Sequence, residues 1–295
     1  MNEKITELKN PLSSKLDQMS TNQIVELINS EDSKISLVIK ELIPLISCLI
    51  NKIVQNIKNG GRLIYVGCGT SGRLGVLDAS ECPPTFSVKR SLVVGVISGG
   101  KNALDTSIEG AEDDKSLAVN DVKKYKINKT DTVIGITTSG TTPYVHKFLR
   151  ESKKIGSYTS ILTSNKISKK HYIDKYITFV VGPEILSGST RMKAGTATKM
   201  ILNIISTTAM IKLNKVYKNY MVDLKVSNEK LNKRALNMIS EITDLNILES
   251  TKLIKQSHGN VKNAILMYFK KISYDESCLI LKNNDDSLRE SLNKN

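Results

Sequence analysis

The chain has 295 residues, of which 40% are hydrophobic, and its formal net charge is +14. This length suffices for one substantial core and a small additional domain, and the lack of tryptophan predicts a core built from aliphatic side chains. The lysines are spread along the whole sequence, and no arginine stripe alternates with aromatic residues. The charge therefore indicates a solvated lysine surface, and we expect no nucleic-acid partner.

The sequence also argues against a membrane-spanning protein and against a metal-binding protein. No window approaches about 18 uninterrupted apolar residues, and the N-terminus has no apolar signal segment, so we expect a cytoplasmic protein without a membrane partner. The four cysteines and three histidines show neither a CxxC pair nor the spacing of metal ligands. We expect reduced thiols, no metal and no cofactor. These residues are Cys48, Cys68, Cys82, Cys278, His146, His171 and His258.

The N-terminal part of the chain predicts helices. Ser20 and Thr21 precede an apolar stretch and form a plausible helix start. Apolar residues then recur at helical spacing from Ile35 to Ile53, and the stretch ends at Asn59-Gly60-Gly61. We interpret residues 1–54 as an N-terminal helical segment.

The middle of the chain alternates between apolar strands and helical stretches. This alternation predicts an α/β fold, a doubly wound parallel sheet with helices on both faces, over residues 55–218. The remainder, residues 219–295, shows short helical patterns and predicts a small C-terminal helical domain. The expected strands are Leu63–Val66, Leu92–Ile97, Thr132–Ile136, Tyr158–Leu162 and Tyr176–Val180. The expected helices cover about residues 71–80, 103–119, 144–154 and 193–213.

Two loops rich in glycine and hydroxyl groups follow strands of this sheet. The first, Gly67–Gly72, has the outline of a dinucleotide-binding turn, but the second strand closes on Ser98-Gly99-Gly100 without the acidic residue that would bind ribose. Small hydroxyls and bare N–H groups at a helix start suit a phosphate monoester instead. The second loop, Thr138–Thr142, repeats this design. Plain helix capping is the alternative interpretation.

Several carboxylates lie close to these loops. Glu81 stands before Cys82-Pro83-Pro84, and the prolines predict that the helix ends there, near the first loop. Glu109 and Glu112 are three residues apart, which would place them on one helix face. Composition alone favours a solvated acidic face for this second pair.

A third polar segment follows the last expected strand. It begins at Glu184 and opens the long helix near Lys193. Arg191 and Lys193 are able to neutralise a phosphate or a carboxylate, although surface charge near a helix start is the plainer interpretation.

Three segments resemble a known family. Residues 61–86 read GRLIYVGCGTSGRLGVLDASECPPTF, residues 107–114 read SIEGAEDD, and residues 182–211 read GPEILSGSTRMKAGTATKMILNIISTTAMI. In these segments the chain resembles the N-acetylmuramic acid 6-phosphate etherases, sugar isomerase (SIS) domain proteins of peptidoglycan recycling and amino-sugar catabolism. The resemblance covers essentially the whole chain. It implies a SIS-type sheet and a homodimer.

The resemblance also implies a reaction and its residues. The family cleaves the D-lactyl ether of N-acetylmuramic acid 6-phosphate by elimination and then hydration, which gives N-acetylglucosamine 6-phosphate and D-lactate. Glu81 matches the family's acid/base glutamate and Glu112 its second active-site glutamate. We expect Glu81 to be the proton donor and Glu112 its partner. The expected substrate- and phosphate-binding residues are Gly69, Thr70, Ser71, Gly72, Ser139, Gly140, Thr142, Glu184 and Lys193.

One position departs from the family pattern. The second loop of the family often carries an arginine where this chain has Thr141, which removes a possible cation near the substrate. Two alternatives remain open on the same fold: a phosphosugar isomerase, and a sugar-phosphate sensor or regulator similar to the glucokinase regulatory protein. The presence of both Glu81 and Glu112 favours the etherase, because a sensor has no need of an acid/base pair.

Overall fold

The computed structural model of the chain describes residues 4–224 and 229–293. The chain divides into two compact units. The first consists of Met1–Ser80 and Arg90–Ser206, and the second of Glu81–Lys89 and Thr207–Asn295.

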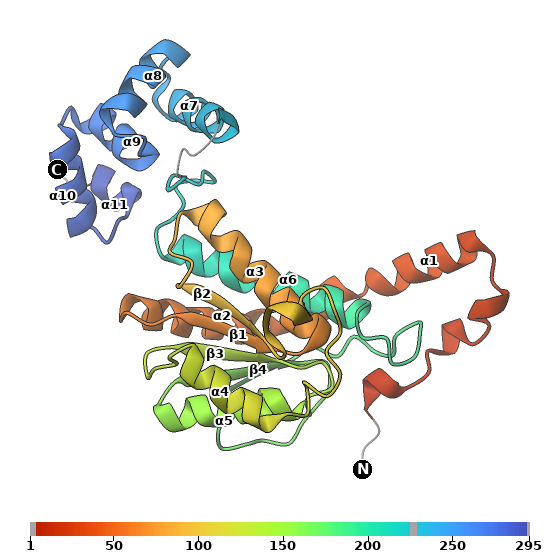
Figure 1. Cartoon of the computed structure of the whole chain (residues 1–295). Coiled ribbons are helices and arrows are strands. Elements are labelled where there is room, and N and C mark those ends of the chain that lie inside the picture. Colours follow the sequence, from red (N-terminus) through yellow and green to blue (C-terminus); the bar gives the residue numbers. More distant parts are fainter. Residues whose placement is uncertain (1–3, 225–228, 294–295) are drawn as a thin grey trace. The chain divides into compact units, whose positions relative to one another are not determined.

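A five-stranded parallel sheet forms the centre of the first unit (Figure 1). The strand order is β2-β1-β3-β4-β5, and every neighbouring pair is parallel. This confirms the predicted α/β class, since the apolar runs that predicted strands do form them. The strands are β1 (Leu63–Gly67), β2 (Val93–Ile97), β3 (Thr132–Ile136), β4 (Tyr158–Thr163) and β5 (Lys175–Thr178).

Helices α4 (Lys115–Lys124) and α5 (Pro143–Ile155) cover one face of the sheet (Figure 1). Ile64 and Val66 of β1 point to this face, where they join a buried cluster with Phe148 of α5. The alternation of side chains along a strand explains why every second residue of β1 belongs to this cluster.

Helices α2 (Ile35–Lys58) and α3 (Gly69–Phe86) cover the opposite face. A Cβ on Gly75 of α3 would lie 3.0 Å from the Cβ of Tyr65, so helix and strand are packed closely there. Asn56 of α2 donates a hydrogen bond of 2.9 Å to the hydroxyl of Thr132 on β3. The sheet is therefore buried on both faces, as its continuous apolar strands require.

From residue 4 onward, the N-terminal segment contains three short 3₁₀ turns before α1 (Thr21–Asp32). Helix α1 begins where the sequence predicts, because Ser20 and Gln23 form a reciprocal capping box. Upstream, the backbone N–H of Ile5 donates to Asn165 at 2.8 Å, which ties the segment to the end of β4. The 3₁₀ turns are η1 (Ile5–Glu7), η2 (Pro11–Ser13) and η3 (Leu16–Gln18).

The predicted end of the helix at Glu81 is wrong. Helix α3 continues through Pro83 and Pro84 to Phe86. Each proline lacks a backbone N–H and costs helix stability, but the side chains of Cys82 and Phe86 are buried, and their burial favours the extra turn. Ser87, with φ of 52°, adopts the left-handed conformation that follows the helix end.

The predicted helix over residues 103–119 is also wrong. The chain forms a short 3₁₀ turn, η4 (Gly100–Ala103), and a loop before α4 begins at Lys115. The carboxylate of Asp114 accepts the N–H groups of Ser116 and Leu117, and this N-cap sets the start of α4. Glu109 and Glu112 therefore lie on a loop and do not share a helix face.

The second unit is helical among the described residues. Its core centres on α9, where Val261, Ala264, Ile265 and Leu266 are fully buried. The helices are α7 (Glu229–Thr243), α8 (Ile247–Gln256), α9 (Val261–Lys270), α10 (Tyr274–Asn283) and α11 (Leu288–Asn293), and the end of α6 (Lys193–Lys212) also belongs here.

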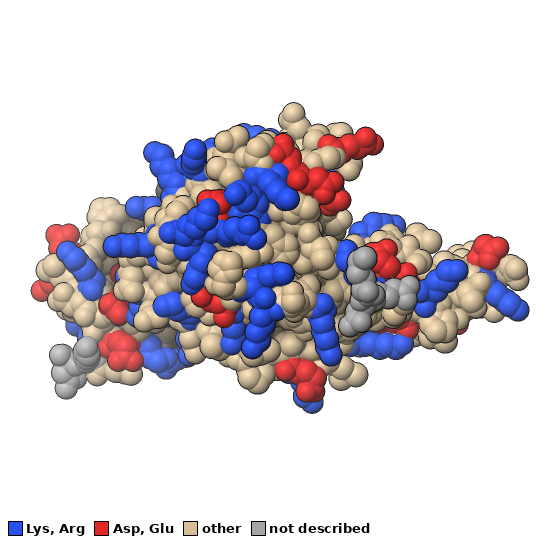
Figure 2. Space-filling model, turned by 90° about the horizontal axis from the view of Figure 1, so that it is seen from below, with Lys and Arg blue, Asp and Glu red and all other residues tan. Residues whose placement is uncertain are grey.

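The surface carries both positive and negative side chains (Figure 2). On the face that Figure 2 shows, lysine and arginine side chains are spread widely, with acidic side chains between them. Among the described residues, no helix combines the length and apolarity that crossing a membrane requires.

Candidate active site

The first hydroxyl-rich loop is held tightly between β1 and β2. A Cβ on Gly72 would lie 2.6 Å from Cγ1 of Ile97 and 2.7 Å from the carbonyl oxygen of Gly67, so no larger side chain fits. Helix α3 therefore starts directly against the carboxyl ends of both strands. Thr70 and Ser71, both half-buried, lie in its first turn. Their role in phosphate binding stays a prediction.

A cavity of about 340 Å³ adjoins this loop, and we call it the first cavity. It brings together two residues that the sequence predicted, Gly69 and Glu112. The remaining lining residues were not predicted as site residues: Cys68, Arg73, Ser98, Ala103, Ser107, Ile108, Glu109, Gly110 and Ala111. The position of Ser98 after a strand was the available signal for its place, because ligands bind at the carboxyl ends of parallel strands.

Two hydrogen bonds hold the loop that carries Glu112. The buried hydroxyl of Ser98 donates to the carbonyl oxygen of Ala111 at 2.5 Å. The backbone N–H of Tyr144, in the first turn of α5, donates to the carbonyl oxygen of Glu112 at 3.0 Å. The backbone of Glu112 is thus fixed from β2 and α5, while its side chain remains exposed at the first cavity.

Cys68 lines the first cavity as a neutral thiol. Burial raises its pKa to about 12, and the negative charges of Glu112 and Asp113 act in the same direction against a hydrogen bond with Ser98. A thiol with so high a pKa is a poor nucleophile at neutral pH. Cys68 therefore lines the cavity as an uncharged side chain and is not expected to act as a nucleophile.

The second hydroxyl-rich loop is organised by its own side chains. The hydroxyls of Thr137 and Thr142 lie 2.7 Å apart, within hydrogen-bond distance. The hydroxyl of Ser139 accepts the backbone N–H of Thr141 at 3.2 Å. These contacts shape the turn that leads into α5.

A second cavity, of about 670 Å³, lies beside this loop and includes Ser139 and Gly140. Thr141 carries no charge, but Lys4 donates to its hydroxyl at 2.9 Å. One cation from elsewhere in the chain, Lys4, thus contacts this position, and Lys166 and Lys170 line the same cavity. The other residues that line the second cavity are Ile5, His146, Asn165, Lys166, Ile167, Ser168, Lys170 and Tyr172.

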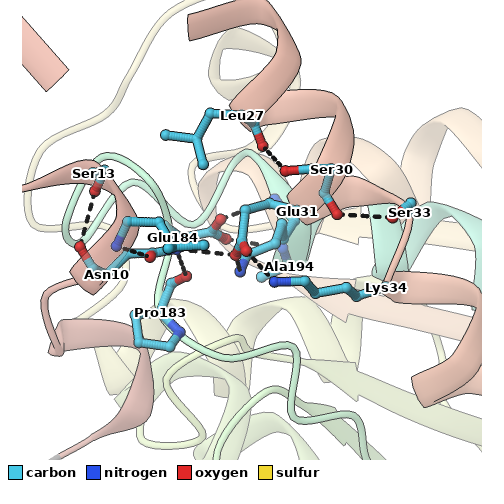
Figure 3. Close-up of polar contacts among 12 residues, drawn as sticks. Asn10, Ser13, Leu27, Ser30, Glu31, Ser33, Lys34, Pro183, Glu184 and Ala194 are labelled. Atoms are coloured by element: carbon cyan, nitrogen blue, oxygen red, sulfur yellow. Dashed lines mark hydrogen bonds and ion pairs between the residues drawn. The ribbon is translucent and has the colours of Figure 1, made fainter. Parts of the chain in front are cut away.

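Glu184 and Lys193 belong to a buried polar cluster, of which Figure 3 shows Asn10, Glu31 and Glu184 gathered together. Glu184 is 1% exposed and accepts the backbone N–H groups of Lys193 and Ala194 at 3.0 and 2.9 Å. It therefore caps the start of α6. Lys193 is 3% exposed, and its ammonium group pairs with Glu31. Their contact with substrate stays a prediction.

Glu31 is a partner that sequence reasoning missed. It is buried on α1, accepts a hydrogen bond from Asn10 at 2.9 Å and forms an ion pair with Lys34. Burial raises its pKa, but the hydrogen bonds and charges of Lys193 and Lys34 outweigh this effect and leave the pKa lowered. Burial raises the pKa of Glu184, and the two backbone N–H groups offset only part of the shift.

Glu81 lies on α3 with an exposed side chain and lines neither of the two cavities. Asp78, one turn earlier, is buried, and its carboxylate accepts the hydroxyl of Ser206 at 3.0 Å. This bond links α3 to α6. Burial raises the pKa of Asp78 against that hydrogen bond.

The chain is similar to known proteins over nearly its whole length. The N-acetylmuramic acid 6-phosphate etherase of Clostridium beijerinckii is 46% identical over 290 residues, which cover 97% of this chain and 95% of that protein. This chain belongs to the N-acetylmuramic acid 6-phosphate etherase family. The family member from Histophilus somni is 45% identical over 289 residues, covering 98% of this chain and 95% of its own.

Broader matches agree with the fold. Residues 45–153 match the family described as the glucokinase regulatory protein N-terminal SIS domain, and residues 218–265 match the C-terminal lid domain of glucokinase regulatory protein. The phosphoheptose isomerase GmhA from Neisseria gonorrhoeae superposes with a TM-score of 0.50 at 15% identity, over 64% of this chain and 98% of that chain. At that identity the match supports the shared fold alone.

Proposed function

We propose that the protein cleaves the D-lactyl ether of N-acetylmuramic acid 6-phosphate and releases N-acetylglucosamine 6-phosphate and D-lactate. The observation that carries this proposal is identity of about 45% to etherases over nearly the whole chain. The first cavity agrees with it, because Gly69 of the expected phosphate loop and the expected catalytic Glu112 line the same space.

The proposed reaction needs two carboxyl groups. Opening of the sugar ring exposes an aldehyde at carbon 1, which acidifies the proton on carbon 2. Glu112 takes that proton, the electron pair forms the double bond between carbons 2 and 3, and the bond from carbon 3 to the ether oxygen breaks. Glu81 gives a proton to the departing lactate oxygen. Water then adds at carbon 3 and gives one proton to Glu81, while Glu112 returns its proton to carbon 2, so both carboxyl groups regain their starting states.

The phosphate is assigned to the hydroxyl loops at the carboxyl ends of β1 and β3. Ser71, Ser139 and Thr142 offer hydroxyls there, and both loops precede helix N-termini, which favour anions. The homodimer, the cytoplasmic location and the division into residues 1–54, 55–218 and 219–295 are likewise proposals. The match to a separate C-terminal family domain from residue 218 supports the last boundary.

The test is D-lactate release from N-acetylmuramic acid 6-phosphate by the full-length protein. Glu81→Gln and Glu112→Gln should each lower kcat by roughly 10²-fold or more, the usual contribution of general acid–base catalysis. Glu109→Gln is the matched control, since Glu109 lines the same cavity three residues away but has no proposed role in proton transfer. Binding of the sugar phosphate without any lactate from the wild-type protein would favour a sensor instead.

A further inference from the structure

Arg73 lies on α3, one turn after Gly69, and lines the first cavity. Two carbonyl oxygens of the loop after η4 fix its guanidinium. Its Nε donates to Leu104 at 2.9 Å and its Nη2 to Thr106 at 3.3 Å. The remaining nitrogen, Nη1, makes no hydrogen bond within residues 4–224 and 229–293. The charged group is thus held in place by backbone that carries no negative charge.

The guanidinium of Arg73 forms no ion pair within the described part of the chain. Arg73 is the one cationic side chain among the described residues that line the first cavity, and it shares that space with the carboxylates of Glu109 and Glu112. Neither carboxylate lies within ion-pair distance, 4.0 Å, of Arg73 in the described part of the chain. A guanidinium that is oriented but unpaired suits a planar anion brought by a ligand, because it presents donors in a fixed fork.

We infer that Arg73 binds the carboxylate of the substrate's lactyl group, an assignment that rests on the proposed function. Carbons 2 and 3 of the sugar are bonded neighbours, so an ether substituent on carbon 3 lies close to the group that removes the proton from carbon 2. Glu112, proposed for that step, lines the cavity that Arg73 also lines. The phosphate is attached to carbon 6, which is three carbon–carbon bonds away from carbon 3.

The assignment makes Arg73 a residue that selects the lactyl ether. The substrate carries the carboxylate, whereas the sugar product, N-acetylglucosamine 6-phosphate, has lost it and keeps the phosphate. Arg73 should therefore increase the affinity for the substrate and leave the affinity for the sugar product almost unchanged. A residue that binds phosphate, or that only stabilises the loop after η4, would affect both ligands equally.

The experiment compares these two ligands on one background. Calorimetry measures the Kd of each for Glu112→Gln, which slows turnover, and for the same protein with Arg73→Met added. The expected result is a rise of roughly tenfold to a hundredfold in the Kd of N-acetylmuramic acid 6-phosphate, the range for a charged hydrogen bond. The Kd of N-acetylglucosamine 6-phosphate should change by less than about threefold, within the small effect of a rim charge.

Any other result refutes either the role of Arg73 alone or the proposed function as well. An equal rise for both ligands, or no rise for either, refutes the role of Arg73 while the etherase proposal stands. Failure of both ligands to bind the Glu112→Gln protein refutes the proposed function together with the inference. Arg73→Lys serves as a second variant if Arg73→Met does not fold: it keeps the charge but loses the fork, so the Kd for substrate should rise by a smaller factor with the same selectivity.

Discussion

Replacing Lys193 with methionine tests how the N-terminal segment is attached to the start of α6. The side chains of Lys193 and Glu31 are 3% and 4% exposed, so the substitution leaves a buried carboxylate without its buried cation. Breaking such a pair typically costs 3–5 kcal/mol. Because Asn10 and Lys34 still contact Glu31, we expect the lower end, about 3 kcal/mol, or more than a hundredfold in the unfolding equilibrium.

The pH dependence should change with the substitution. In the wild-type protein the pKa of Glu31 is lowered from 4.5, so its contribution to stability is present above that pH and is lost as the pH falls through the folded-state pKa. Lys193 lowers the pKa of Glu31, and burial raises it. Without Lys193, the effect of burial is opposed less strongly, so the folded-state pKa of Glu31 should rise. Stability of Lys193→Met, relative to wild type, should therefore improve toward acidic pH. Urea unfolding followed by circular dichroism, from pH 4 to pH 8, measures this difference.

Lys34 offers a matched control. It pairs with the same carboxylate, but its side chain is 56% exposed, so Lys34→Met should cost less than about 1 kcal/mol. The double variant Lys193→Met/Glu31→Gln should recover part of the lost stability, since no buried charge is then left alone. A loss below about 1 kcal/mol for Lys193→Met, or a double variant as unstable as the sum of its single changes, would refute the reasoning.

Single residues of the first unit offer further tests. Ser98→Ala removes the hydroxyl that holds the loop 107–112, so kcat for D-lactate release should fall roughly fivefold, the worth of one hydrogen bond; an unchanged kcat would contradict this. Iodoacetamide at pH 8 should label the exposed Cys48 and spare Cys68, whose pKa is raised to about 12 by burial; peptide mass spectrometry showing equal labelling would contradict it. Gly95→Ala would bring a Cβ within 2.5 Å of the backbone of α3, so thermal unfolding should show a loss of about 1–3 kcal/mol, and an unchanged midpoint would count against close helix–sheet packing.

The residue pattern within short segments was sufficient to predict much of the fold. Apolar runs bounded by glycine and polar residues predicted every strand of the sheet, because a strand buried on both faces needs a continuous apolar stretch. The capping residues Ser20 and Gln23 lie only three positions apart in the sequence, so the start of α1 was also open to prediction. Glu81 was noticed from its position near the first loop, whereas Glu112 came from family resemblance, since composition alone favoured a solvated face for it. The catalytic roles of both came from the resemblance.

Predictions failed where burial competed with local preference. Two prolines predicted the end of α3, but the buried side chains of Cys82 and Phe86 favour another turn. The acidic segment 107–114 was predicted as helix, but Asp114 caps the helix that begins after it. Burial and cap choice depend on what packs against a segment, and that information is not in the segment itself.

The sequence by itself determined the parallel sheet, the hydroxyl-rich loops at the carboxyl ends of its strands, and the family resemblance, because these depend on spacing within short segments. Only the tertiary structure decided that Glu31 pairs with Lys193 across 162 positions of the chain, and that loop carbonyls fix Arg73 at the cavity of Glu112. Charge pairs of this kind form between residues that share no spacing rule, since the fold alone brings them within a few ångströms and removes the water between them.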